Sequence, residues 1–212
     1  MIGVGDPVGN GLVKSLAQPG GNSTALSNMA TDLVPKLMEM LRSMVPRLTL
    51  VAVLVNPANA ANISGLKDIR TAAQKIGVKI LAVEAGTTQK IADGIAVMAR
   101  QDVGALIVLL DALFIQQKTQ IVELAAKQRL PSIAAHSEYA EAGGLMSYGQ
   151  NIGENYKRAA TYVDKILKGA NPGDLPVEQP TSFELVINRN TAKALGLTIP
   201  QSLLVQATKV IE

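Results

Sequence analysis

An uninterrupted apolar run, Leu50–Val55, constrains the fold of this chain more than any other feature. A valine-rich run without polar residues is typical of a strand buried on both faces, as in the parallel sheets of α/β proteins. Asn59 can cap a following helix, in which apolar residues recur at helical spacing until Gly77: Ile63, Leu66, Ile69, Ala73 and Ile76. A second apolar run, 78–83, comes next. The stretch therefore predicts a β–α–β unit with a right-handed crossover.

The same alternation of strands and helices continues along the chain. We predict further helices over 8–17, 32–44, 88–100, 113–128, 151–167 and 191–195 and from Pro200, and further strands over 23–27, 104–110, 132–135, 143–149 and 183–188. Asp32 is expected to cap the helix that it begins. Together these elements predict an α/β fold built on a doubly wound parallel sheet. The break after Gly149 indicates that the chain leaves this sheet for a second body.

Composition narrows the class of protein. At 212 residues the chain can form one large α/β domain or two small lobes. Apolar residues make up 48% of it and aromatic residues only 3%, so the core must be aliphatic. The net charge of +3 is scattered, without a run of lysine or arginine. Because nucleic-acid binding needs a concentrated basic surface, that function is not expected.

The chain contains no cysteine. This excludes disulfides, zinc–thiolate sites and thiol nucleophiles, and we predict no metal or cofactor site. No apolar stretch approaches the ~18 residues that span a membrane. The first residues, Met1–Pro7, have neither the basic segment nor the hydrophobic region of an export signal.

Polar residues follow the predicted parallel strands on what is expected to be one edge of the sheet. Ligands of open parallel sheets bind at this edge, beyond the carboxyl ends of the strands. The candidates are Asn56, Asn59, Glu84, Thr87, Asp111, His136, Ser137, Glu138 and Tyr148. The alternative for Asn56, Asn59 and Asp111 is that they only cap helices. Their recurrence after successive strands favours a site for a small solute.

His136 is the only histidine of the chain and the one candidate for acid–base catalysis. A triad would pair it with a serine and an acid. Residues 21–25 are a near match to a nucleophile elbow but lack the preceding strand. Ser137 adjoins His136, and neighbours on an extended segment point to opposite faces. Residues 3–9 are rich in glycine but match neither dinucleotide nor phosphate-loop spacing. Catalysis is therefore the weaker interpretation.

Several longer stretches resemble the ABC-transporter substrate-binding protein family that includes TrpX-like proteins. They cover nearly the whole chain in the expected order: residues 6–9, 16–22, 51–57, 142–149, 164–170, 175–180, 183–188 and 192–200. Such a series is far more specific than any short motif above. The resemblance implies a binding protein rather than an enzyme, with an ABC permease in the membrane as its partner and a periplasmic or extracytoplasmic location.

The resemblance also implies a periplasmic-binding-protein type I fold, in which two α/β lobes close on a ligand. Residues 29–149 are then expected to form a complete second lobe, and 1–28 with 150–212 a partial first lobe. The expected ligand-binding residues are Asp6 and Tyr148 on the hinge side and, on the second lobe, Asn56, Asn59, Asp111, His136 and Ser137. Family substrates include aromatic amino acids, so we expect a small solute of that kind. An aspartate such as Asp111 suits an ammonium, and helix N-termini suit a carboxylate.

Full members of this family begin with an export or lipoprotein signal and about half a lobe before the loop at Asp6. We therefore expect an N-terminally shortened member, for which a homodimer sharing strands is one possible assembly. Three alternatives stay open: a ligand-sensing regulator core of the same fold, a small α/β enzyme that uses His136, and a nonfunctional remnant of a binding protein.

Overall fold

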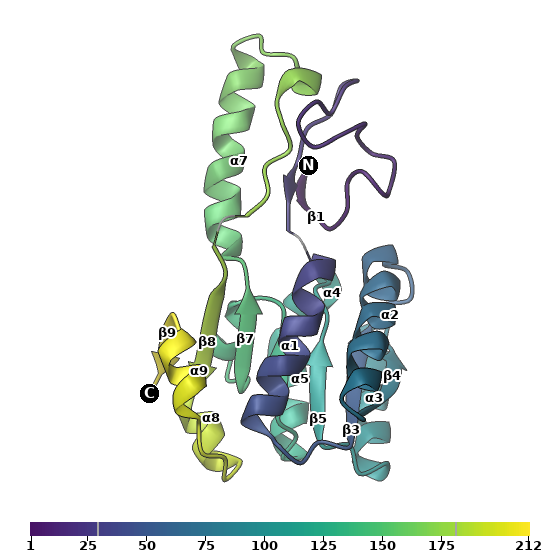
Figure 1. The fold of residues 1–212 in the computed structure, drawn as a ribbon, viewed down its shortest axis with the longest axis vertical. Coiled ribbons are helices and arrows are strands. Elements are labelled where there is room, and N and C mark those ends of the chain that lie inside the picture. Colours follow the sequence, from purple (N-terminus) through teal and green to yellow (C-terminus); the bar gives the residue numbers. More distant parts are fainter. Residues whose placement is uncertain (29, 181) are drawn as a thin grey trace.

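The protein has a large body that contains a sheet and a small body that stands at one end of it (Figure 1). The structure is a computed structural model that describes residues 1–28, 30–180 and 182–212; the side chains of residues 30–32 and 152 also lie outside its description, including the expected cap at Asp32. None of the helices in these ranges is both long and apolar enough to cross a membrane.

Within the described residues, the large body is built on a seven-stranded sheet. Its spatial order is β4 (Lys79–Glu84), β3 (Leu50–Val55), β5 (Ala105–Val108), β6 (Ser132–Ala134), β7 (Met146–Gly149), β8 (Glu184–Asn188) and β9 (Lys209–Ile211). The strands from β4 to β7 run parallel, β8 is antiparallel to β7, and β9 is parallel to β8. The predicted α/β fold with a mainly parallel sheet is confirmed.

Helices cover both faces of this sheet, as a doubly wound fold requires. They are α1 (Ala30–Met44), α2 (Ala60–Lys75), α3 (Thr88–Arg100), α4 (Ala112–Gln116), α5 (Lys118–Lys127), α6 (Glu138–Glu141), α8 (Arg189–Ala194) and α9 (Gln201–Gln206). One core joins α1, α2, α8 and α9 to the sheet, and the other joins α3 and α5 to the opposite face. Strand β3, which lies between β4 and β5, sends Val51 and Val53 into the first core and Ala52 and Leu54 into the second. Burial on both faces explains its uninterrupted apolar run.

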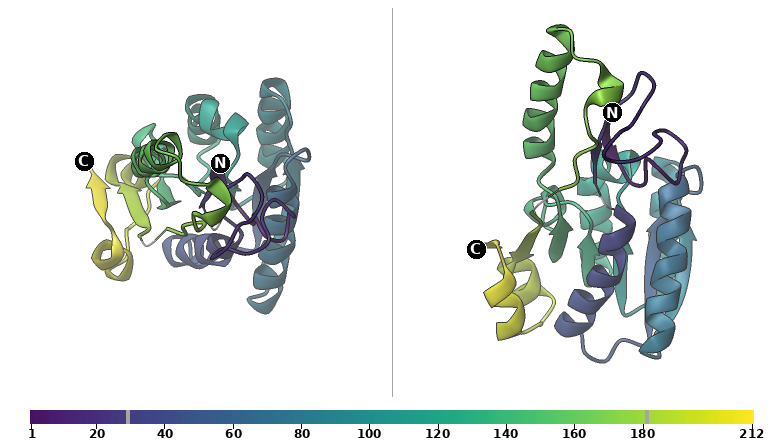
Figure 2. Two further views of the ribbon diagram at one scale, coloured as in Figure 1. Left: turned by 90° about the horizontal axis from the view of Figure 1, so that it is seen from above. Right: turned by 45° about the horizontal axis from the view of Figure 1, so that its top comes forward.

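The small body consists of residues 1–28 and 151–180. A short parallel pair, β1 (Ile2–Val4) and β2 (Leu26–Ser27), packs beside the long helix α7 (Ile152–Leu167), and a 3-10 turn (Pro172–Asp174) follows. Its apolar clusters are small. One joins Val13, Ala25 and Val177, and the other joins Leu26 to Ala159 and Tyr162 of α7. Figure 2 shows α7 rising away from the sheet beside the N-terminal segment.

The C-terminal tail differs from the expected lobe boundary. Residues 150–212 were expected together in the first lobe, whereas β8 and β9 extend the seven-stranded sheet of the large body. Only α7 and the segment up to residue 180 stand with residues 1–28. The return of β8 beside β7 is a non-local antiparallel pairing, and no local sequence pattern reveals such a pairing.

Some predicted elements were wrong. Residues 8–17 form turns rather than a helix, because the carbonyl of Pro7 accepts from both Leu12 and Val13 and the chain folds back at once. The helix predicted over 113–128 is divided at Gln117 into α4 and α5. Strand β9 was not predicted.

Candidate ligand-binding site

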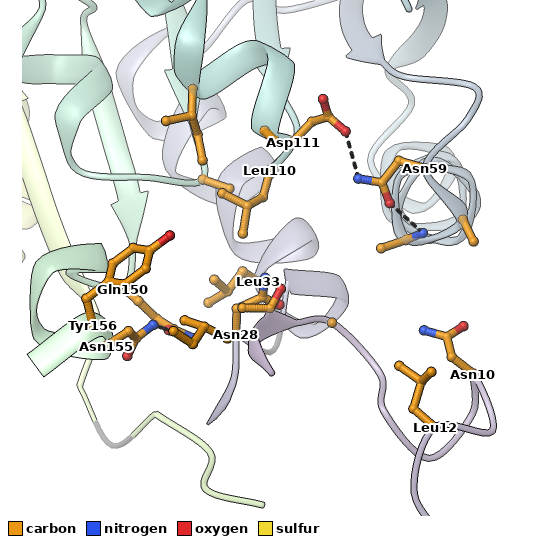
Figure 3. A pocket seen from close by; sticks show the side chains of 18 residues that line it. Asn10, Leu12, Asn28, Leu33, Asn59, Leu110, Asp111, Gln150, Asn155 and Tyr156 are labelled. Carbon is orange, nitrogen blue, oxygen red and sulfur yellow. Dashed lines mark hydrogen bonds between the residues drawn. The ribbon is translucent and has the colours of Figure 1, made fainter. Parts of the chain in front are cut away.

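A cavity of about 530 Å³ lies where the small body meets the carboxyl-terminal edge of the large sheet (Figure 3). This volume lies within the ~300–1,000 Å³ range of ligand pockets. The large body contributes Leu33, Asn59, Ala60, Ala61, Leu110, Asp111, Ala112, Ile115 and Ala135. The small body contributes Ile2, Gly3, Gly5, Asn10, Leu12, Asn28, Asn155 and Tyr156, and Gln150 lies between β7 and α7. The lining is mostly apolar with a few amides and one carboxylate, which suits an amphipathic small molecule.

The carboxylate of Asp111 is the centre of a hydrogen-bond network on one wall of this cavity. Asn56 donates through Nδ2 to both carboxylate oxygens at 3.2 Å. Asn59 donates to Oδ2 at 2.8 Å, and the backbone N–H of Leu113 donates to Oδ1 at 2.9 Å. The network fixes the position of the carboxylate without neutralising its charge.

The sheet topology brings these residues together. Strands β3 and β5 are parallel neighbours, so the residues that follow them meet at one edge. Asn62 of α2 links the two strand ends: its Nδ2 donates to the carbonyl of Leu110 at 2.9 Å, and its Oδ1 accepts from the N–H of Asn56 at 3.0 Å. Asn59 caps α2 by accepting from the N–H of Ala61 at 3.0 Å. The predicted cap and the predicted site residue are therefore the same side chain.

The charge of Asp111 has no counterion among the described residues. No Lys, Arg or His of the described ranges forms an ion pair with it, and the residue is only 7% exposed. A buried carboxylate is costly unless a cation or several hydrogen-bond donors compensate it. Its donors here are neutral amides, so this wall of the cavity has a negative charge suited to a cationic group of a ligand.

Amide side chains also connect the two bodies at Gln150, which lies between β7 and α7. Asn28 donates to the carbonyl of Gly3 at 2.7 Å. Gln150 donates to the carbonyl of Ser27 at 3.4 Å, and Asn155 of α7 donates to Oε1 of Gln150. This chain of amides holds the small body against the end of β7.

Two predicted site residues on the hinge side lie away from the cavity lining. Asp6 is exposed, and its carboxylate accepts from the N–H of Gly9 at 2.8 Å, which closes a turn. Tyr148 is half-buried and packs against Phe183, with ring centroids 5.9 Å apart. Neither is among the described residues that line the cavity.

His136 and Ser137 follow β6 but are also outside the described lining. His136 is fully buried, with Nδ1 3.2 Å from the carboxylate of Glu138 and its ring edge-on to Tyr139. This hydrogen bond lowers the pKa of Glu138. Ser137 is buried, and its carbonyl accepts from the hydroxyl of Ser147 at 3.2 Å. Both side chains are therefore buried just after the end of β6. Asn56 is also outside the described lining and contacts Asp111, which belongs to it.

Sequence reasoning missed several residues of the lining. Gln150 comes directly after β7, so the same strand-end rule could have found it. Asn28, Asn155 and Tyr156 belong to the small body, and their place at the cavity depends on how that body packs against the sheet. No pattern in the sequence indicates this packing. The described residues also contain no group of three or more acidic, histidine or cysteine side chains able to hold a metal ion.

Comparison with known proteins identifies the family. A family model described as ABC transporter substrate binding protein matches residues 1–211. The chain belongs to this family. The resemblance of the sequence to this family is thus confirmed, and the type I periplasmic-binding-protein fold is shown by the solved structures of relatives.

A solved structure from Vibrio cholerae, titled a conserved domain protein, is 30% identical, with a TM-score of 0.89 over 98% of this chain and 69% of its own. An ABC domain from Streptococcus pneumoniae in complex with L-Trp is 28% identical, with a TM-score of 0.87 over 99% of this chain and 73% of its own.

Two relatives come from Clostridioides difficile. A tyrosine-binding protein is 25% identical over 93% of this chain, which spans 56% of that protein. The ligand-free, open structure of a substrate-binding protein with adhesive properties is 26% identical, with a TM-score of 0.69 over 99% of this chain and 70% of its own. The chain thus spans little more than half the length of the curated relative.

Proposed function

We propose that this protein binds an α-amino acid with an aromatic side chain in the cavity between its two bodies, as the solute-binding component of an ABC importer. The observation that carries the proposal is the Asp111 carboxylate, buried in the cavity wall and held only by neutral donors. Relatives that bind tryptophan and tyrosine support the choice of ligand class.

The ammonium of the amino acid is assigned to Asp111. A charge-assisted hydrogen bond between nitrogen and a carboxylate has a typical length of ~2.7–2.9 Å. The contact of Asn59 with the carboxylate, 2.8 Å, is already in this range, whereas both contacts of Asn56 are 3.2 Å. The Asn56 contacts are therefore the ones that an ammonium displaces at the lower cost.

The carboxylate of the amino acid is assigned to the beginning of α2. Ala60 and Ala61, the first residues of this helix, line the cavity next to Asn59. The N–H of Ala61 already donates to the cap Asn59, so the partial positive charge of the helix N-terminus is what favours an anion here. An amino acid has its two charged groups on one carbon, and here the two complementary groups of the protein lie on neighbouring strand ends.

Closure of the two bodies is the proposed mechanism. The present arrangement superimposes better on the relative in complex with L-Trp (TM-score 0.87) than on the ligand-free, open relative (0.69). This difference supports assigning the arrangement to the closed form. Contacts that a ligand makes with both bodies stabilise that form, which an ABC permease then recognises. An extracytoplasmic location is part of the same proposal.

A thermal-shift screen followed by calorimetry tests the function. L-Trp, L-Tyr and L-Phe are expected to raise the melting temperature, because a ligand that binds only the folded state stabilises it. Tryptamine lacks the carboxylate and indole-3-propionate lacks the ammonium, so each is expected to bind more weakly than L-Trp. If none of the twenty amino acids shifts the transition, the proposed ligand class is wrong.

Of the rival functions, the enzyme hypothesis gains no specific contact from the cavity. The enzyme hypothesis needs His136 at a substrate, and its ring is fully buried beside Glu138 and Tyr139 rather than on the cavity lining. Turnover of an ester panel that His136→Ala abolishes would revive it. The regulator hypothesis shares the ligand site, and permease and ATPase genes beside the gene for this chain would favour import.

A further inference from the structure

Tyr156, near the start of α7, is the one aromatic residue among the described residues that line the cavity. The chain is poor in such residues, with four tyrosines, two phenylalanines and no tryptophan. Phe114, Tyr139 and Tyr162 are buried in apolar cores. Tyr148 and Phe183 pack against each other. Tyr156, by contrast, is 61% exposed. A large ring left at a cavity rim is available for contact with a ligand.

The position of the ring is opposite the polar wall. In Figure 3, Asp111 and Asn59 lie on one side of the cavity, and Tyr156 lies on the other side beside Gln150. Leu33 and Leu110 lie between them. A molecule whose charged end contacts Asp111 therefore extends its other end over an apolar floor towards the tyrosine ring.

Aromatic rings gain more from a neighbouring ring than from an aliphatic group of similar size. Offset or edge-to-face ring pairs contribute beyond the area that they bury. The lining also supplies the aliphatic side chains of Leu33, Leu110 and Ile115, which can contact any apolar group. Among the described lining residues, the ring of Tyr156 is thus the group that can favour an aromatic over an aliphatic side chain.

We propose that Tyr156 is the specificity-determining residue of this cavity and packs its ring against the aromatic side chain of the bound amino acid. The inference rests on the proposed function and adds the residue that selects among amino acids. Because Tyr156 belongs to α7 of the small body and Asp111 to the large body, the ring contact exists only when the two bodies are together. An aromatic ligand therefore stabilises the closed form more than an aliphatic ligand does.

Calorimetric titration of three variants tests this role: Tyr156→Phe, Tyr156→Leu and Tyr156→Ala. Each is titrated with L-Trp, L-Tyr, L-Leu and L-Met. Tyr156→Phe is expected to keep the affinity for L-Trp, since the ring remains. Tyr156→Ala is expected to weaken L-Trp about tenfold, the size of a lost ring pair and its buried area. Tyr156→Ala is expected to change the affinity for L-Leu less than twofold. Tyr156→Leu is expected to abolish the preference for aromatic over aliphatic ligands.

Val163→Ala is the matched control, because Val163 is a 55% exposed apolar residue of the same helix and does not line the cavity. It is expected to leave all four affinities unchanged. Equal losses for L-Trp and L-Leu in Tyr156→Ala would show a merely structural role and overturn the inference. If the unaltered protein binds none of the four ligands, the proposed function itself fails, and this outcome is distinct from the first.

Fluorescence gives a second measurement of the same contact. Since the protein has no tryptophan, the indole of bound L-Trp is the only indole in the complex. Excitation of the tyrosines is expected to produce indole emission by energy transfer, and Tyr156→Phe is expected to lower that emission at equal occupancy. Unchanged transfer in Tyr156→Phe would place the ligand away from residue 156 and contradict the proposal.

Discussion

The large and small bodies of this protein differ in how they are stabilised. The large body has two extensive cores, one on each face of its sheet, with many side chains fully buried. The small body has a two-stranded sheet and two small clusters. Most of the exposed large apolar side chains of the described residues also belong to it: Met1, Ile2, Val8, Leu12, Tyr156, Val163 and Leu167.

This difference suggests a division of roles. The large body holds the Asp111 network rigidly at the ends of β3 and β5, where polar groups need exact placement. The small body contributes apolar contacts and amides, and a short parallel pair is marginal without further support. Local opening is therefore expected first in the small body, where few buried contacts must be lost.

The largest loss of folding stability is expected from a substitution in the core of the large body. Phe114 is fully buried in the core formed with α3 and α5. Phe114→Ala is expected to lower the free energy of unfolding by about 3–5 kcal/mol, because it removes a buried ring and leaves a cavity. Urea denaturation measures this loss. A loss below about 1 kcal/mol would contradict the view that the large body is the more tightly packed of the two, since its core would then tolerate a void.

A smaller and local effect is expected in the small body. The hydroxyl of Tyr162 donates to the carbonyl of Pro176 at 2.8 Å and so fastens α7 to the returning segment. Tyr162→Phe removes this bond at a cost of about 1 kcal/mol. Hydrogen exchange is expected to accelerate in residues 1–28 and 153–180 and to stay unchanged in β3 and β5. Equal acceleration throughout would mean that the two bodies unfold as one unit.

The smallest effect on folding stability is expected from a change at Glu138 of the large body, and it depends on pH. The hydrogen bond with His136 lowers the pKa of Glu138 below its ordinary 4.5. A carboxyl whose folded pKa is depressed stabilises the fold above its unfolded pKa, and that stability is lost as pH falls through the folded value.

Glu138→Gln is therefore expected to flatten the loss of stability below about pH 4.5 and to leave the small-body exchange rates unchanged. Denaturation midpoints across an acid series measure the slope. An identical acid slope in the variant and the unaltered protein would show that the Glu138–His136 contact contributes nothing to folding.

The elements of the large body could be predicted well from the sequence, because the spacing of their apolar residues is a local pattern. The apolar run of β3 follows from the burial of that strand on both faces. The helical spacing of apolar residues in α2 follows from the burial of one face of the helix. Asn59 and Asp111 were predicted at the cavity because parallel strands end at one edge. These two residues now line one wall of it.

The sequence could not reveal contacts that depend on packing between distant segments. Strand β9 and the antiparallel return of β8 involve partners far along the chain. Tyr156 lies on an amphipathic helix, where spacing alone does not tell which exposed residue faces a cavity. His136 looked functional as the only histidine, yet its burial beside Glu138 follows from the fold beneath the strand ends.

The affinity of the Asp111→Asn variant for L-Trp, measured by calorimetry, tests the central claim most directly. The substitution keeps the shape of the side chain but removes the charge that is expected to hold the ammonium. The matched control is Asp93→Asn on the exposed surface of α3. We expect Asp111→Asn to weaken L-Trp at least tenfold, about 1.4 kcal/mol, while Asp93→Asn has no effect. Equal affinity in the Asp111 variant and the unaltered protein would contradict the account.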